Sequence, residues 1–184
     1  MSEPLNIKKL TAQEFWPLFE KHRDGLFEDC HFFFSREVRS AHEQECFPAL
    51  KAGLSKTEIH FGLFDQEERF VGWSTSFQMR LNELYMMNSA VLPEHRRQGH
   101  YSRMVQATLE EAKKLGFQIV TSNHVATNNS VIIAKLKLGF KITGFEMSDE
   151  MGVLVKLTHY LNATRERAAD YRAGLIKPTE ELKK

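Results

Sequence analysis

The 184-residue chain is 42% hydrophobic and 27% charged with a formal net charge of +1, a composition that is typical of a globular protein and excludes a disordered or fibrous one. Because the charge is near neutral and no long run of Lys and Arg occurs, nucleic acid is excluded as an expected partner. No segment approaches the roughly 18 uninterrupted apolar residues of a membrane span, and Cys30 and Cys46 accompany no secretion signal, so we expect a soluble, cytoplasmic protein without a membrane partner.

The N-terminal third of the chain predicts a strand followed by two helices. Residues 5–10 alternate weakly between apolar and polar side chains, which favours a strand. Thr11 and Glu14 then form a capping box that predicts the start of a helix. An aromatic run at residues 32–34 precedes an amphipathic stretch at residues 35–50, which predicts the second helix.

Three antiparallel strands follow. The β-rich runs at residues 59–64 and 70–77 are separated by a charged turn at residues 65–69, so they predict a hairpin. A third run at residues 84–92 stops at Pro93, which cannot donate a hydrogen bond to a sheet.

The next segment predicts a parallel crossover. Beyond Gly99, apolar residues recur at helical spacing until Gly116, which is a typical helix stop. Residues 117–122 then read as a strand. The order of strand, helix and strand indicates a βαβ unit whose two strands run parallel.

The rest of the chain predicts a short helix, two strands and a tail. The helix spans residues 130–138, and the strands span residues 141–145 and 153–159. We expect residues 1–160 to form a single α/β domain and residues 161–184 to form a charged extension that is helical or frayed.

The loop from Val91 to Ser102 has the features of an anion site. It joins a strand end to a helix N-terminus, where free backbone N–H groups and the helix dipole favour negative charge. Arg96 and Arg97 add positive charge, and Gly99 permits a positive φ or a close approach of the backbone to phosphates. The alternative is an ordinary turn with solvated arginines.

This loop resembles the acetyl-CoA-binding motif of the GCN5-related N-acetyltransferase (GNAT) family, in which a strand ending in Val-x-Pro leads into Arg-x-x-Gly-x-Gly/Ala. Residues 91–93 and 96–100 match that pattern, and the resemblance extends over about residues 61–145. Tyr101 stands where the family usually has Gly or Ala, so the loop must open or the ring must turn outward.

A second segment resembles the family element that lies along the pantetheine arm. It comprises residues 128–130 and 138–140. The resemblance implies that Asn128 hydrogen-bonds the pantetheine and that Ser130 lies near it. On spacing alone, Asn128 is equally well explained as a helix N-cap.

The resemblance implies a mixed, mostly antiparallel sheet with a central, splayed parallel strand pair, flanked by helices. It makes acetyl-CoA the expected cosubstrate, with Ala90 and Leu92 as the candidates for main-chain contacts in the gap between the parallel strands. A main-chain N–H aimed at the thioester carbonyl would stabilise the developing oxyanion. The residues assigned to the cosubstrate site are Ala90, Val91, Leu92, Arg96, Arg97, Gln98, Gly99, His100, Tyr101, Ser102, Asn128 and Ser130.

The implied reaction is direct attack of a neutral amine on the acetyl thioester. Since an alkyl ammonium has a pKa near about 10, a base must take a proton. Glu83, before the third strand, is the first candidate and His124 the second; the alternatives are a solvated carboxylate and a structural histidine. Lys135 occupies the position of the family's usual tyrosine acid, so no general acid is assigned, although Tyr101 and Ser130 are conceivable donors.

The acceptor amine is not identified by the sequence. The aromatic run at residues 32–34 either packs in the core or contributes to the acceptor pocket. The eight histidines are dispersed, so no metal is expected. The resemblance suggests a homodimer, and the alternative function is a noncatalytic acyl-CoA-binding sensor or interaction module.

Overall fold

A computed structural model describes residues 5–23, 26, 41–42, 45 and 57–177 of the chain. The strands are β1 (Asn6–Leu10), β2 (Glu58–Phe64), β3 (Phe70–Arg80), β4 (Glu83–Val91), β5 (Ile119–Val125), β6 (Lys141–Ser148) and β7 (Gly152–Tyr160). The helices are α1 (Ala12–Arg23), the 3₁₀ turn η3 (Pro93–His95), α3 (His100–Lys114), α4 (Asn129–Lys137) and α5 (Ala163–Arg172). The aromatic run at residues 32–34, both cysteines and nearly all of the predicted helix at residues 35–50 lie outside the described residues.

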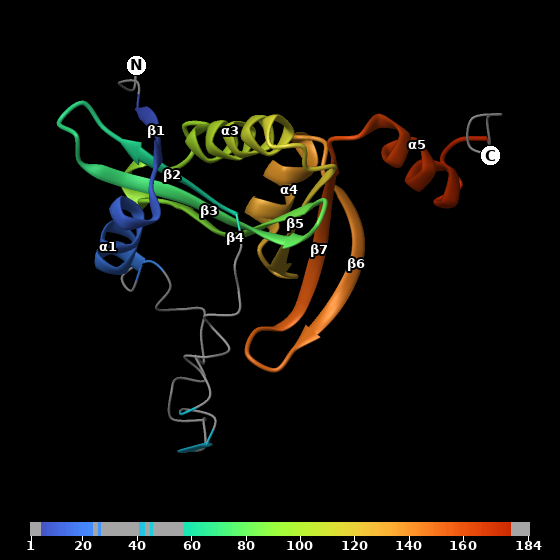
Figure 1. Cartoon of the computed structure of the whole chain (residues 1–184), viewed down its shortest axis with the longest axis horizontal. Helices are drawn as coiled ribbons and strands as arrows, with labels where there is room; N and C mark the ends of the chain where they lie inside the picture. Colours follow the sequence, from blue (N-terminus) through green and yellow to red (C-terminus); the bar gives the residue numbers. More distant parts are fainter. Residues whose placement is uncertain (1–4, 24–25, 27–40, 43–44, 46–56, 178–184) are drawn as a thin grey trace.

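The strands form one seven-stranded sheet in the order β1-β2-β3-β4-β5-β7-β6 (Figure 1). Every neighbouring pair is antiparallel except β4 and β5, which run parallel in the middle of the sheet. The expected mixed α/β fold is therefore confirmed. Within the described residues, each predicted strand and helix is present, with ends that differ by a few residues.

The capping box predicted at the start of α1 is formed. The Glu14 carboxylate accepts from the Thr11 backbone N–H at 2.8 Å, and the Glu14 N–H donates to the Thr11 hydroxyl at 3.3 Å. Both donors are among those that a helix start leaves without an intrahelical partner. The helix therefore begins where the local sequence predicts.

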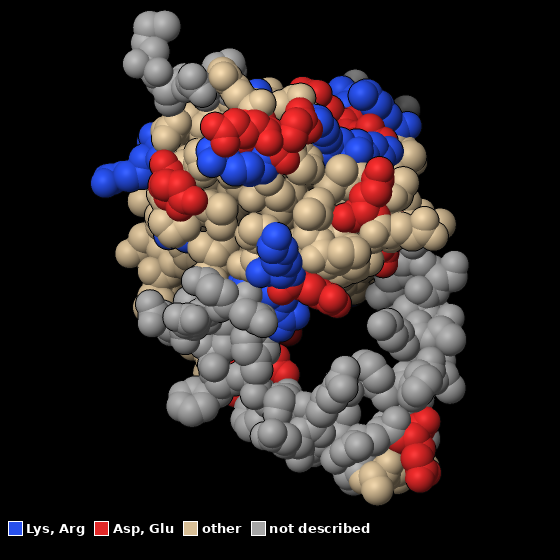
Figure 2. Space-filling view, turned by 90° about the vertical axis from the view of Figure 1, so that its left-hand side faces the viewer, with Lys and Arg blue, Asp and Glu red and all other residues tan. Residues whose placement is uncertain are grey.

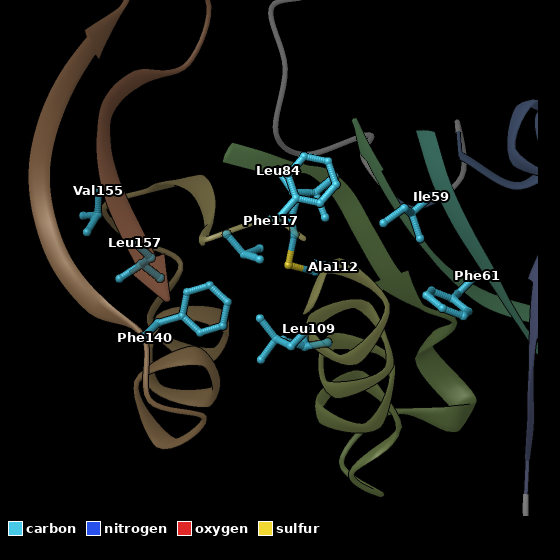
Figure 3. Packing of buried hydrophobic residues seen from close by; sticks show 12 residues of the cluster. Ile59, Phe61, Leu84, Leu109, Ala112, Phe117, Phe140, Val155 and Leu157 are labelled. Atoms are coloured by element: carbon cyan, nitrogen blue, oxygen red, sulfur yellow. The ribbon is translucent and has the colours of Figure 1, made fainter. Parts of the chain in front are cut away.

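The main core lies between the sheet and the helices α3 and α4 (Figure 3). Val105, Leu109 and Ala112 form the buried stripe of α3, with spacing that places them on one helix face. They pack against Leu84 of β4 and Val120 of β5, the two parallel strands. Because burial of each such aliphatic side chain contributes about 1.5–3 kcal/mol, this cluster holds α3 firmly over the centre of the sheet.

The helix α1 packs through a separate aromatic cluster. Phe15 and Phe19 are its buried residues, and Phe19 meets the ring of Trp73 on β3 edge to face, with ring centroids 5.5 Å apart. Figure 1 shows α1 and α3 on opposite sides of the sheet. The sheet is thus covered on both faces near β2 and β3.

The C-terminal extension is helical over α5. Asn162 caps the helix by accepting from the Arg165 N–H at 3.0 Å. Lys141 of β6 binds Asp170 and Glu166 at 2.5 and 3.1 Å, and no residue of α5 is buried. Polar contacts, rather than a hydrophobic face, therefore attach this helix to the sheet.

The described surface carries no extended region of one charge in the view of Figure 2, where Lys and Arg alternate with Asp and Glu. This distribution agrees with the near-neutral net charge of +1. None of the described helices is both long and apolar enough to cross a membrane.

Candidate active site

The two parallel strands separate soon after they meet. Their register contains three pairs and ends at Tyr85 of β4 and Thr121 of β5. Beyond that point residues 86–91 pair only with β3, and residues 122–125 pair only with β7. A gap in the middle of the sheet results, with Met86 and Ser122 as the first residues at its apex.

A cavity of about 560 Å³ occupies this gap. Its lining comes from both strands, from the start of α3, from α4 and the loop before it, and from the β6–β7 turn. It consists of Met86, Met87, Asn88, Ser89, Tyr101, Asn123, His124, Val125, Thr127, Asn128, Val131, Lys135 and Met151. Of the predicted site residues, Tyr101, His124 and Asn128 are in this set. Mixed polar and apolar walls of this volume suit a small organic ligand.

The β4 backbone presents alternate residues to the gap. The Leu92 N–H donates to the Val71 carbonyl of β3 at 2.9 Å, so it is directed away from β5. Because an antiparallel ladder alternates, Ala90 also faces β3, whereas Val91 and Ser89 face the gap. The structure therefore favours Val91 and Ser89, rather than the expected Ala90 and Leu92, for main-chain contacts with a ligand there.

The start of α3 leaves its backbone donors open. Gly99 is the N-cap with φ of 81°, no side chain caps the helix, and the first turn contains no acidic residue. The N–H groups of the first turn and the positive end of the helix dipole are thus available to an anion. A Cβ at Gly99 would meet nothing within 4 Å, so the glycine is required by its left-handed backbone and not by crowding.

The polar side chains of this loop divide into structural and exposed ones. Arg96 donates through Nε to the Val91 carbonyl at 2.9 Å, which ties the loop to the end of β4. Gln98 pairs with the buried His100 at 3.3 Å, and burial lowers the pKa of His100. Arg97 is exposed and has φ of 63°, a conformation that costs a non-glycine residue about 1–2 kcal/mol. Such strain persists where surrounding structure imposes it and is frequent at ligand sites.

Tyr101 is turned inward, not outward. Its ring packs against two core clusters and lines the cavity, while Ser102 beside it is half-buried. Burial raises the pKa of Tyr101 above its ordinary value of 10.0, so the hydroxyl stays protonated. The bulky residue at this position is therefore accommodated by the core.

The start of α4 is capped as the spacing predicts. Asn128 Oδ1 accepts from the Val131 N–H at 3.4 Å and from the Ser130 hydroxyl at 3.2 Å. The N-cap interpretation of Asn128 is thus observed, and the same residue lines the cavity. Ser130 is exposed and does not line the cavity.

One residue not assigned to the site from the sequence, Lys135, lies at its apex. Its Nζ donates to Ser122 Oγ at 2.7 Å, lies 3.4 Å from Met86 Sδ and is 4.7 Å from the centre of the Phe140 ring. The side chain is 1% exposed, and burial lowers the pKa of Lys135 to about 7. The available signal was its position four residues after Val131, on the face of α4 that meets the sheet.

His124 contacts the same serine, Ser122, as Lys135 does. Its Nε2 lies 3.0 Å from Ser122 Oγ, so His124, Ser122 and Lys135 form one chain of polar contacts. Burial, together with the nearby Lys135 charge, lowers the pKa of His124 to about 3. The imidazole is therefore neutral near pH 7 and is a weak base.

Glu83 lies at the closed end of the parallel pair, outside the cavity lining. The side chain is buried and accepts from the Thr121 hydroxyl at 2.7 Å. Lys156 and Arg80 lie 3.9 and 3.7 Å from its two oxygens. The structure thus brings His124, Tyr101 and Asn128 together and leaves Glu83 beside the apex.

Residues 17–140 match the model of the acetyltransferase (GNAT) family, which is more than half of the chain. The chain belongs to the GNAT acetyltransferase family. No curated protein matches the sequence. Family membership confirms the expected enzyme class, an acyltransferase, and supports acetyl-CoA as its cosubstrate.

Solved GNAT structures share the fold at low sequence identity. The ribosomal-protein-S18-alanine N-acetyltransferase from Escherichia coli aligns with a TM-score of 0.60 and 17% identity, over 86% of this chain and 95% of that one. A GNAT family acetyltransferase from Elizabethkingia anophelis with acetyl-CoA bound gives 0.61 and 13%, over 87% and 100%. An N-acetyltransferase from Staphylococcus aureus gives 0.63 and 15%, over 87% and 100%.

The described residues of this GNAT member fit an extended anionic thioester. The exposed donors at the start of α3 suit its phosphates, and the cavity between β4 and β5 suits a polar arm that ends in a sulfur. Open space beside Gly99 leaves the phosphate end unobstructed.

Proposed function

We propose that this GNAT member transfers the acetyl group of acetyl-CoA directly to a primary amine of a small molecule or a protein. The proposal depends chiefly on one observation, the cavity that opens where β4 and β5 separate, beside the uncapped start of α3. In this proposal a phosphate site at the start of α3 and the cavity in the sheet adjoin end to end. An anionic ligand with a long, partly apolar arm requires both.

In this proposal each end of the site binds a different part of the cosubstrate. The N–H groups of the first turn of α3, together with Arg97, bind the pyrophosphate. The pantetheine arm lies in the gap, where Asn128 offers its amide group. The gap-facing N–H of Val91 is a main-chain donor for the pantetheine arm, and that of Ser89, nearer the apex, is the donor for the thioester carbonyl, whose oxygen gains charge when the amine attacks.

The amine must lose a proton during attack, and the two predicted bases differ in suitability. Burial and the neighbouring Lys135 charge lower the pKa of His124 to about 3, so a proton taken from the amine would create a second buried positive charge there. Glu83 is a carboxylate beside the gap, but it already accepts from Thr121. We therefore assign the base role to Glu83 acting through a water molecule, and assign His124 a hydrogen-bonding role.

A noncatalytic acyl-CoA-binding module is the second candidate. It is favoured by the position of Glu83, which lies outside the cavity and within 3.9 Å of the Lys156 ammonium. A carboxylate held by Thr121 and close to Lys156 is not free to reach an amine in the cavity. The two candidates agree on the ligand and differ on turnover.

A turnover assay distinguishes the acetyltransferase from the noncatalytic module. The purified chain is incubated with acetyl-CoA and a panel of primary amines, including polyamines, aminoglycosides and peptides with free N-termini, and products are identified by mass spectrometry. Acetylated amine with equimolar CoA release is the expected result. Micromolar acetyl-CoA binding by calorimetry without any product across the panel would support the noncatalytic module, and no binding by the folded chain would contradict both.

The cytoplasmic location and the homodimer remain predictions. Sedimentation equilibrium of the full chain tests the second.

A further inference from the structure

We propose that Lys135 is the proton donor to the CoA sulfur when the thioester breaks. This inference deepens the proposed function and rests on it. It assigns a catalytic group to the position where the resemblance to the family implied a tyrosine.

The position of Nζ at the apex of the gap carries the proposal. Met86 and Ser122 are the first residues beyond the last β4–β5 pair, and Lys135 Nζ contacts both, at 3.4 and 2.7 Å. The ammonium group thus joins the two strands where they separate. A sulfur at the inner end of the cavity would meet this group.

Among the described residues, no carboxylate lines the cavity beside Lys135. The contacts of Lys135 are Ser122 from β5, Met86 from β4 and the Phe140 ring; His124 lies one hydrogen bond further, and Tyr101 lines the same cavity. All of them are neutral near pH 7, since the pKa of His124 is lowered and that of Tyr101 is raised. Among the described residues that line the cavity, Lys135 is the only Lys or Arg, and no Asp or Glu is present.

A buried ammonium without a carboxylate destabilises the fold, because desolvation disfavours the charged form. Burial accordingly lowers the pKa of Lys135 to about 7, close to the pH at which a donor can both hold and release a proton. Strongly perturbed pKa values cluster at functional sites. An arriving thiolate would provide the anion that the folded protein does not.

The amine lone pair forms the C–N bond at the thioester carbon, and the C–S bond breaks with its electron pair on sulfur. The Nζ–H proton of Lys135 passes to sulfur, which gives CoA thiol and neutral Lys135, while the proton of the amine leaves through Glu83 and water. After CoA leaves, neutral Lys135 regains a proton from water that enters the cavity, which Lys135 lines.

Titration of the bound CoA thiol tests the proposal without any amine. CoA is bound to the wild type and to Lys135→Met, and the thiolate absorbance is followed against pH. An ordinary thiol has a pKa of about 8.5. If Nζ faces the sulfur, the thiolate should appear at a pH about half a unit or more lower in the wild type than in Lys135→Met, because the two adjacent groups titrate as a coupled pair and the protonated lysine favours the thiolate.

Lys137→Met is the matched control, since Lys137 lies on the same helix but is exposed. It should titrate like the wild type. Lys135→Gln, which keeps a donor for Ser122, repeats the test if the methionine variant fails to fold.

An equal thiol pKa in the wild type and in the folded Lys135 variants, with CoA bound to each, overturns the proposal. Absence of CoA binding by the folded wild type instead overturns the proposed function on which it rests.

Discussion

The two helices that border the cavity contribute to the site in opposite ways. At the start of α3 the chemistry comes from the backbone: N–H groups, the helix dipole and a glycine with φ of 81°. On α4 it comes from one buried side chain, Lys135, whose properties depend on Ser122, Met86 and Phe140. The first region is exposed and local in sequence, whereas the second is enclosed and assembled from three separate segments.

This difference shows which part of an active site a short motif can encode. An anion loop needs only a strand end, a glycine and a helix start, so a dozen consecutive residues specify it. The pKa of a buried lysine depends on what the whole fold places around it. Changes at the two regions should therefore differ in kind: α3 variants should alter binding, and α4 variants should alter chemistry.

The largest expected effect is a loss of kcat on substitution of Lys135 in α4. Lys135→Met should lower kcat by about 100-fold, the lower range for loss of general acid catalysis, while the Kd for acetyl-CoA changes little. Steady-state kinetics with an amine found by the screen and calorimetry measure the two quantities. Lys137→Met should match the wild type, and a Lys135→Met enzyme with normal kcat would show that Lys135 has no role in the chemistry.

The pH profile sharpens the same prediction. A donor must be protonated, so the wild-type kcat should fall as pH rises through the pKa of Lys135, about 7 unless the bound cosubstrate raises it. Lys135→Tyr should recover part of the activity and move this fall to higher pH, because a tyrosine keeps its proton longer. If kcat fell at the same pH in the wild type and in Lys135→Tyr, the pH dependence would come from a group other than Lys135.

At α3 the expected effect is on affinity. Gly99→Glu puts a carboxylate at the phosphate site and a side chain on a left-handed backbone, and should weaken acetyl-CoA binding at least about tenfold, or 1.4 kcal/mol. Gly116→Glu is the matched control, since Gly116 ends the same helix with φ of 85° and equally open space. Calorimetry that finds equal losses in both variants would attribute the effect to backbone strain alone.

Stability should depend on pH through Lys135. Its pKa is about 7 in the folded chain and 10.5 ordinarily, so between these values the unfolded chain binds the extra proton and stability rises with pH. From pH 7 to 9, the free energy of unfolding of the wild type should gain about 2 kcal/mol relative to Lys135→Met. Urea denaturation at the two pH values measures this difference, and parallel curves for the two proteins would contradict the lowered pKa.

The smallest expected effect is on acetyl-CoA affinity at Asn128, and it distinguishes ligand binding by this residue from its role as the N-cap of α4. Asn128→Ser keeps a capping oxygen and should cost only a few tenths of a kcal/mol of stability, but it removes the amide and should weaken acetyl-CoA binding by a few-fold. Asn162→Ser makes the same change at the N-cap of α5, which does not line the cavity. Equal affinities in both variants would leave Asn128 as a cap only.

Most of the fold was predictable because its signals are local. The Thr11–Glu14 capping box, the apolar stripe of α3 and the arrest of a strand at Pro93 each depend on a few neighbouring residues. The parallel pairing of β4 and β5 follows from the crossover through α3.

The details of the site depended on information that no short segment contains. Whether Ala90 or Val91 faces the gap is decided by the register with β3, and the ring of Tyr101 is placed by two core clusters. The burial of Lys135 likewise results from the packing of α4 against both parallel strands. Sequence patterns give helix faces and strand alternation, but not strand register.

The central claim is that the start of α3 and the gap between β4 and β5 form one ligand site. Hydrogen–deuterium exchange of the full chain, with and without acetyl-CoA, tests this directly at the level of backbone amides. Acetyl-CoA should slow exchange both at residues 99–102 and in the gap at residues 86–91 and 122–125, and Gly99→Glu should reduce both effects together. Protection at residues 99–102 alone, or protection that avoids both segments, would contradict the account.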